Sequence, residues 1–271
     1  MNNFWALFYG FIQGVTEFLP VSSSGHLALM PYFFELKDPG VVFDLLMHLG
    51  TALAVIIYFQ NDIKRLIFEF FKLIFKKDLE NTVFIQNFLS ATFFSFLLIL
   101  LIKDLAFAYG RSSLLIGINF IVFGLLMYLA DRLKSLKLDL TKKRDFKRAI
   151  FIGLSQSLAV FPGVSRSGIT LTSARFLGMG RVEAGRFSFL LSLPVILGSI
   201  IFKLPEILQG EATYVSFDII FTGVMSSFFF GLLTIHFFLK LIGKLGLGVF
   251  SLYRLIIGLA LIILYFNPMS H

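Results

Sequence analysis

Long apolar runs separated by short polar segments dominate the chain. Six of these runs are long enough to cross a bilayer as helices, and they lie at residues 40–60, 83–102, 114–130, 186–202, 216–239 and 247–266. Two further regions, 3–36 and 149–180, are apolar but are interrupted near their centres by Pro, Gly and Ser. Each is predicted to form two half-length helices joined by a loop at membrane depth. The pattern therefore predicts an all-α polytopic membrane protein with six spanning helices plus two re-entrant half-helix hairpins.

Composition supports this class of protein. Hydrophobic residues make up 57% of the 271 positions, charged residues only 15%, and the mean hydropathy is +0.87. Soluble domains rarely reach such values. No polar stretch is long enough to bury a core of its own, so residues 1–271 are expected to form a single integral membrane domain. The chain has no cysteine, which excludes disulfides and thiolate metal sites.

Basic residues predict the orientation in the membrane. The segment 131–148 is rich in Lys and Arg and is expected to be a cytoplasmic loop. The amphipathic segment 61–82 falls on the same side and is expected to lie along the interface. The segment 203–215 is less basic and is expected to be a loop on the extracytoplasmic side. The net charge of +8 is therefore interpreted as a sign of topology, and nucleic acid is not an expected partner.

The two interrupted regions contain the same short motif. The frame Val-Ser-x-Ser-Gly occurs at 21–25 and again at 164–168, a constant offset of 143 residues. Counting the predicted spans from the cytoplasmic basic loop places the first hairpin on the outer side of the membrane and the second on the cytoplasmic side. We therefore predict an inverted-topology repeat of about 1–130 and 149–266. The copies differ at Glu17, Ser23 and His26 of the first, which predicts one composite site built from both halves.

Glu17 is the first ionisable side chain in the sequence and lies inside an apolar segment. A carboxylate at that depth costs several kcal/mol unless it is paired, metal-bound or hydrated. Gln13, four residues earlier, lies on the same helical face. Together Gln13 and Glu17 offer oxygen ligands for a hard divalent cation such as Mg²⁺ or Ca²⁺. A structural pairing of Glu17 with an arginine is the alternative.

The repeated serines and glycines precede predicted helices. Backbone N–H groups at a helix N-terminus, together with hydroxyl groups, form a site for phosphate, although small residues also serve close helix packing. Arg166 in the second copy adds a guanidinium whose planar fork matches phosphate oxygens. The expected substrate-binding residues are Gln13, Thr16, Ser22, Ser24, Gly25, Gly163, Ser165, Ser167, Gly168 and Thr170.

Two histidines are candidates for a functional role. His26 follows the first loop directly and is a candidate general acid, base or nucleophile toward a phosphoryl group. His48 lies within a predicted span and either faces a cavity or bonds a carbonyl group. Arg175, Arg181 and Arg186 flank the second hairpin and are expected to be anchors at the cytoplasmic interface.

Residues 13–26 and 162–170 resemble the two signature motifs of the bacterial undecaprenyl-diphosphate phosphatase family linked to bacitracin resistance. The resemblance continues through 43–51 and 183–194, and so covers essentially the whole chain. It implies hydrolysis of undecaprenyl diphosphate to undecaprenyl phosphate, the lipid carrier of peptidoglycan precursors, with release of inorganic phosphate.

The resemblance also implies a divalent metal, a homodimer, and a site in the bacterial plasma membrane that opens to the extracytoplasmic side. By position, Gln13 and Glu17 match the acidic element of the family, with Gln in place of Glu at position 13. Ser23, His26 and Arg166 match residues associated with catalysis. The nucleophile remains open among Ser23, His26 and water.

Two other functions remain compatible with these patterns. An inverted repeat with interrupted helices is typical of transporters, so a flippase for polyprenyl phosphate is the main alternative. The acid-phosphatase-like lipid phosphatases share the Ser-Gly-His and Ser-Arg elements, but they need an upstream Lys/Arg-Pro element and a further His, and neither occurs here.

Overall fold

The computed structural model describes residues 2–34, 40–76, 79–109, 112–208 and 216–267. Within these ranges the regular structure is helical, apart from one isolated bridge between Leu138 and Met179. The helices are α1 (Asn3–Phe18), α2 (Ser23–Phe33), α3 (Val41–Tyr58), α4 (Gln60–Ile74), α5 (Val83–Tyr109), α6 (Ser113–Arg132), α7 (Phe146–Ser157), α8 (Arg166–Phe176), α9 (Arg181–Leu208), α10 (Phe217–Leu245) and α11 (Gly248–Phe266), with 3-10 turns η1 (Leu79–Thr82) and η2 (Leu158–Val160).

Five described helices are long and apolar enough to cross a membrane, namely α5, α6, α9, α10 and α11. A sixth span is counted only if α3 and α4, which are bent by 81° at their junction, are taken together. All six predicted runs thus lie in helices, and the prediction of an all-α polytopic membrane protein is confirmed. Helix α4 is amphipathic as expected, since Asp62 and Glu69 are buried while Phe68 and Phe71 are exposed.

The two interrupted regions each fold into a pair of short helices. Helices α1 and α2 have 16 and 11 residues, and α7 and α8 have 12 and 11. A bilayer crossing needs about 20 residues, so none of the four spans a membrane alone. The half-length helices and the break between them agree with the sequence pattern, and their re-entrant path through the bilayer stays a prediction.

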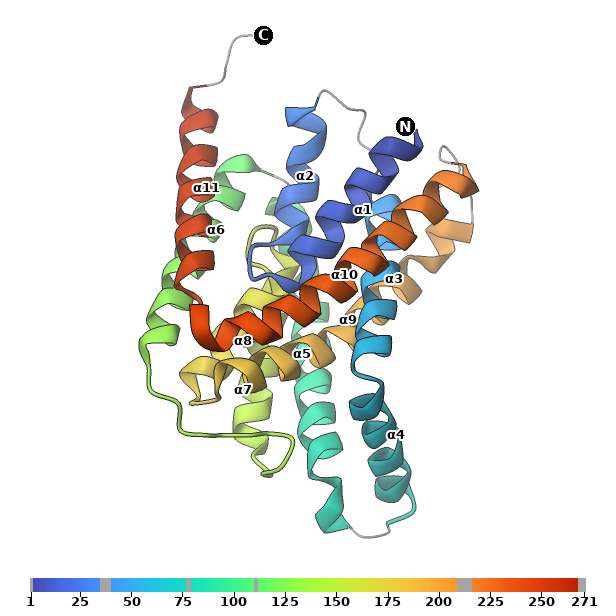
Figure 1. The fold of residues 1–271 in the computed structure, drawn as a ribbon, viewed down its shortest axis with the longest axis vertical. Helices are drawn as coiled ribbons and strands as arrows, with labels where there is room; N and C mark the ends of the chain where they lie inside the picture. Colours follow the sequence, from blue (N-terminus) through green and yellow to red (C-terminus); the bar gives the residue numbers. More distant parts are fainter. Residues whose placement is uncertain (1, 35–39, 77–78, 110–111, 209–215, 268–271) are drawn as a thin grey trace.

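Corresponding helices of the two halves pack in corresponding ways. Helix α1 lies along α10, and α7 lies along α5 (Figure 1). A Cβ atom at Gly10 would come within 2.2 Å of the carbonyl oxygen of Gly223, and one at Gly153 within 2.1 Å of that of Ala91. Glycine is needed at both positions because the backbones meet there. Gly10 and Gly153 are separated by the same offset as the two loops.

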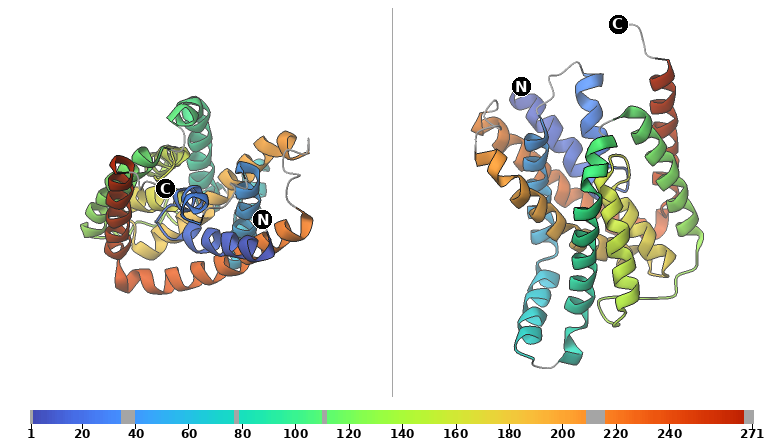
Figure 2. Two further views of the ribbon diagram at one scale, coloured as in Figure 1. Left: turned by 90° about the horizontal axis from the view of Figure 1, so that it is seen from above. Right: turned by 180° about the vertical axis from the view of Figure 1, so that it is seen from behind.

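The long helices surround the half-helices. Helix α10 runs along one side of the molecule, and α6 and α11 pack together at one end (Figure 2). Helices α3 and α9, which follow the two half-helix pairs, also contact each other. This arrangement holds the loops that precede α2 and α8 close together inside the protein.

Ion pairs between largely buried aspartates and partly exposed arginines join the helices near the basic loop 131–148. Asp131 of α6 accepts hydrogen bonds of 2.7 and 2.9 Å from Arg181 of α9. Asp62 of α4 accepts one of 3.0 Å from Arg186. Arg175 is only 4% exposed. These arginines therefore tie helices together, which is a more specific role than the interface anchors expected from the sequence.

The close approach of α1 and α10 can be tested by adding one methyl group. Gly10→Ala is expected to lower the free energy of unfolding by about 1–3 kcal/mol, because the new Cβ overlaps a backbone carbonyl that cannot move aside easily. Thermal unfolding of the purified protein in detergent measures the effect. Gly248→Ala is the matched control, since nothing lies within 4 Å of a Cβ there. Equal unfolding temperatures for the two variants would contradict the close packing.

Candidate active site

The loops before α2 and α8 have the same local structure. Ser22 caps α2 with a positive φ of 73°, and Ser165 caps α8 with a φ of 71°. In each loop the serine hydroxyl accepts a hydrogen bond from the N–H group of the glycine three residues later, Gly25 at 3.4 Å and Gly168 at 3.1 Å. Positive φ is uncommon for serine, so a shared strained turn supports the repeat inferred from the sequence.

Glu17 lies at the meeting point of the two loops. Its carboxylate oxygen Oε2 accepts hydrogen bonds from the Ser23 hydroxyl at 2.6 Å and from the Gln13 amide at 3.0 Å. Its other oxygen, Oε1, forms an ion pair with Arg166 of α8. The Glu17 side chain is 4% exposed and that of Arg166 is 15% exposed. The structure therefore brings four predicted site residues of both halves into one buried cluster.

His48 of α3 joins this cluster. Its Nε2 lies 3.4 Å from Oε2 of Glu17, and its Nδ1 donates a hydrogen bond of 2.7 Å to the backbone oxygen of Asp44. Arg166 also donates to the backbone oxygen of Ser192 at 3.4 Å. The sequence left His48 open between a cavity and a carbonyl group, and the structure shows the bond to a carbonyl group together with a contact to Glu17.

Both ring nitrogens of His26 have hydrogen-bond partners other than the Ser23 hydroxyl. Its Nδ1 donates to the backbone oxygen of Ser22 at 2.8 Å, and its Nε2 lies 2.6 Å from the hydroxyl of Tyr253. The two rings stack with their centroids 5.8 Å apart. Because Nδ1 carries a proton, Nε2 of the neutral ring accepts from Tyr253. The Ser23 hydroxyl donates to Glu17 instead, so Glu17 is the proton acceptor that this geometry provides for Ser23.

Several predicted binding residues use their hydroxyl groups within the protein. Thr16 donates to the backbone oxygen one turn earlier at 2.6 Å, and Thr170 does the same at 2.8 Å. Ser167 donates to the backbone oxygen of Leu19 at 3.1 Å and so links the second loop to the first. Ser24 lies 3.3 Å from the hydroxyl of Ser22. These contacts hold the loops in position.

Arg254 of α11 was missed by the sequence interpretation. It is 1% exposed, and its guanidinium donates to the backbone oxygens of Pro20 at 3.3 Å and Gly163 at 2.8 Å, one from each loop. It also donates to Asn119 and Phe120 of α6. Within the described residues no carboxylate pairs with Arg254. An arginine inside an apolar run is costly, and that signal was present in the sequence.

The charges of the site favour an anion. The one carboxylate of the cluster, from Glu17, pairs with Arg166, while the guanidinium of Arg254 contacts backbone oxygens of both loops. The two arginines therefore leave one positive charge in excess. N–H groups at the starts of α2 and α8 add partial positive charge at the same place. The arrangement is therefore complementary to a phosphate or diphosphate group.

A divalent cation would have few ligands from the protein alone. Across the described residues there is no group of three or more His, Asp or Glu side chains that could enclose a metal ion. However, the amide oxygen of Gln13 is buried without a hydrogen-bond partner, beside the carboxylate of Glu17. Mg²⁺ is commonly held by one or two protein oxygens together with substrate phosphates and water. These two residues fit a cation site of that kind, completed by the substrate.

The fold and the site together define an integral membrane protein with a buried cluster of charged and polar side chains, built from two similar loops between half-length helices. Comparison with known proteins identifies the family of the chain. Residues 6–260 match the family of bacitracin resistance protein BacA, and the chain belongs to this family.

Two relatives show how far the similarity extends. The chain is 37% identical to the undecaprenyl-diphosphatase of Aliivibrio salmonicida over 263 residues, which cover 97% of this chain and 98% of that protein. It is 42% identical to the undecaprenyl-diphosphatase of Saccharophagus degradans over 261 residues, covering 96% and 97%. The family resemblance inferred from the two motifs is confirmed.

Arg254 is expected to hold the two loops in register. In Arg254→Lys the charge remains, but the four hydrogen bonds to backbone oxygens cannot all be made by one ammonium group. Each buried acceptor left without a partner costs about 1–3 kcal/mol, so the thermal unfolding temperature is expected to fall clearly. Arg132→Lys, at an exposed arginine of α6, is the matched control. If both variants unfold at the wild-type temperature, Arg254 does not hold the loops.

Proposed function

We propose that this protein hydrolyses undecaprenyl diphosphate to undecaprenyl phosphate and inorganic phosphate, and so recycles the lipid carrier for cell-wall synthesis. The observation that carries the proposal is the contact of the Ser23 hydroxyl with Glu17, which is itself paired with Arg166 across the two loops. Family membership supplies the substrate, since both relatives carry the name undecaprenyl-diphosphatase.

In the proposed reaction, the Ser23 oxygen attacks the terminal phosphorus of the diphosphate and Glu17 accepts its proton. The bond between that phosphorus and the bridging oxygen breaks, and undecaprenyl phosphate leaves with the bonding electrons. Glu17 passes its proton to the bridging oxygen of this leaving group. Water then loses a proton to Glu17 and cleaves the phosphoserine, which releases inorganic phosphate, and Glu17 returns that proton to the Ser23 oxygen. The 2.6 Å hydrogen bond from Ser23 to Glu17 favours this route over direct attack by water.

Arg166 provides charge stabilisation in this scheme. When the diphosphate enters, the guanidinium exchanges its contact with the Glu17 carboxylate for contacts with phosphoryl oxygens, which frees Glu17 to act as a base. In this scheme the N–H groups in the first turns of α2 and α8 that are not taken up by Ser22 and Ser165 supply further donors to the phosphoryl oxygens. Arg254 keeps both loops in place through their backbone oxygens.

We also propose that Gln13 and Glu17 hold a divalent cation, Mg²⁺ or Ca²⁺, together with the substrate. Such an ion, when bound, neutralises charge on the diphosphate. Gln13 contributes an uncharged oxygen where the family element allows a second carboxylate, so the affinity for the free cation is expected to be modest.

The setting of the enzyme is part of the proposal. The chain is a multi-pass membrane protein, and we place it in the bacterial plasma membrane as a homodimer with its site open to the extracytoplasmic side. The basic residues of 131–148 support a cytoplasmic position for that loop.

The first test is phosphate release from undecaprenyl diphosphate by the purified protein, with and without EDTA. We expect release that depends on a divalent metal and that falls about 10²–10⁴-fold in Glu17→Gln, because general-base catalysis contributes that much. A lipid carrier without hydrolysis, the alternative function, predicts no phosphate release from folded wild-type protein. Activity that persists in EDTA would exclude the cation.

The second test separates a serine nucleophile from water. Ser23→Ala is expected to lower kcat by about a thousandfold or more, and acid quenching of the wild type with labelled substrate is expected to trap a phosphoserine. Ser155→Ala is the matched control, since the Ser155 hydroxyl donates to the backbone oxygen of Phe151 within α7 and is not among the expected site residues. A Ser23→Ala variant with nearly full activity would assign the attack to water.

A further inference from the structure

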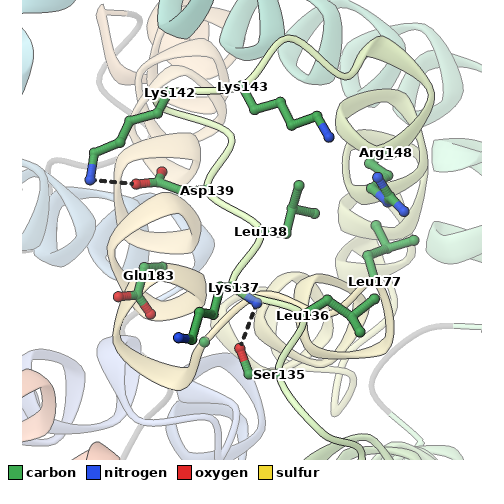
Figure 3. Close-up of a pocket in the computed structure, with 11 residues that line it drawn as sticks. Ser135, Leu136, Lys137, Leu138, Asp139, Lys142, Lys143, Arg148, Leu177 and Glu183 are labelled. Carbon is green, nitrogen blue, oxygen red and sulfur yellow. Dashed lines mark hydrogen bonds and ion pairs between the residues drawn. The ribbon is translucent and has the colours of Figure 1, made fainter.

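A second polar cavity lies at the basic end of the protein. It has a volume of about 690 Å³ and is enclosed by the segment 135–143, the start of α7 and the turn between α8 and α9 (Figure 3). The reaction loops lie at the opposite end of α8, which has 11 residues. At 1.5 Å per residue this is a separation of roughly 16 Å, so the cavity is distinct from the active site.

The walls of the cavity are held by buried hydrogen bonds. Asn87 of α5 donates to the backbone oxygens of Leu140 and Lys143, both at 2.8 Å, and accepts from the N–H group of Asp145 at 3.1 Å. The backbone of Leu136 donates to that of Gly178 at 2.8 Å. The cavity is therefore formed by an ordered backbone rather than by a loosely packed loop.

The charges of the cavity are unevenly distributed. Lys142 pairs with Asp139 at 3.3 Å. Burial acts to raise the pKa of Asp139, but hydrogen bonds from Thr141 and the Lys142 pair outweigh it and lower the pKa, so this pair is ionised and neutral overall. Lys143 forms no close ion pair within the described residues. Burial acts to raise the pKa of the nearby Asp145 carboxyl group, but the hydrogen bonds and charge of Arg148, followed by the charge of Lys143, outweigh it and lower the pKa.

One side of the cavity is therefore cationic. Arg148 contacts Asp145 through one guanidinium nitrogen, Nη1, and its other guanidinium nitrogens make no hydrogen bond to the part of the chain that the structure describes. Figure 3 shows Lys143 and Arg148 on the same side of the cavity, with Glu183 on the opposite side. An anionic group is favoured between Lys143 and Arg148.

Part of the remaining lining is apolar, alongside Ser135 and Lys137. Leu136 is 70% exposed, and Leu177 forms part of the wall. The cavity lies where α6 ends at Arg132 and α9 begins at Arg181, that is, at the ends of two spanning helices. A free phosphate ion would gain nothing from apolar surface, whereas the glycerol and first acyl carbons of a phospholipid would.

We propose that this cavity binds the phosphate headgroup of an anionic phospholipid between Lys143 and Arg148, with the start of an acyl chain over Leu136. The cavity is of the size that small-molecule sites have in proteins. Basic pockets between helix ends at a membrane surface are suited to anionic lipid headgroups.

The test uses the purified full chain in detergent and short-chain phosphatidylglycerol as the probe, with phosphatidylcholine of equal chain length for comparison. Native mass spectrometry measures the fraction of protein with bound lipid. Lys143→Gln is expected to weaken phosphatidylglycerol binding about fivefold, the effect of one basic residue at a lipid surface. Lys147→Gln is the matched control, because Lys147 belongs to the same basic segment but does not line the cavity, and its binding is expected to be unchanged.

Removing a negative charge from the cavity provides a second, opposite test. Glu183→Gln removes a carboxylate from the cavity and is expected to tighten phosphatidylglycerol binding, while Lys143→Arg is expected to retain it. Equal binding by Lys143→Gln and Lys147→Gln would overturn the site. Displacement of the lipid by an equal concentration of soluble glycerol phosphate would overturn the assignment of a phospholipid as the ligand, and would assign the cavity to a soluble phosphate compound. Phosphate release by Lys143→Gln confirms that the variant is folded.

Discussion

The buried carboxylate of Glu17 is the group around which the site is organised. A negative charge among apolar helices is tolerated only if other groups stabilise it, and here Arg166, Ser23 and Gln13 do so together. Since Arg166 comes from the second half of the chain, the ion pair requires the two loops to meet. The same contacts prepare the chemistry, because the group that accepts the Ser23 proton is already in place.

Close backbone approach makes this meeting of the loops geometrically possible. Glycines at 10 and 153 allow α1 and α7 to pack against the backbones of α10 and α5, so the half-helices lie deep inside the protein. Arg254 then fixes the loops through their backbone oxygens, without a carboxylate of its own among the described residues. The position of both loops thus depends on the packing of α11, the helix that carries Arg254.

At the basic end of the protein, charged residues form ion pairs between helices. There most charges are paired, as in Arg181 with Asp131 and Arg186 with Asp62, and these pairs connect helices that the lipid bilayer alone would not hold in register. Lys143 forms no such close pair, and together with Arg148, which keeps guanidinium nitrogens beyond its contact with Asp145, it borders an ordered cavity. Excess positive charge at a membrane surface sets the topology, and at this position it also forms a site for an anionic headgroup.

The sequence by itself determined the helices, the two interrupted segments and the pairing of Glu17 with a loop that carries Arg166. Apolar run length decides which segments cross a bilayer, and the repeated Val-Ser-x-Ser-Gly frame requires two equivalent turns. Only the tertiary structure decided that Ser23 donates to Glu17, that His26 pairs with Tyr253, and that Arg254 binds both loops. Arg254 and Pro20 are 234 residues apart in the chain, and their contact depends on how α11 packs against α6. Local patterns determine which elements form, whereas contacts between distant residues arise only when the helices are packed together.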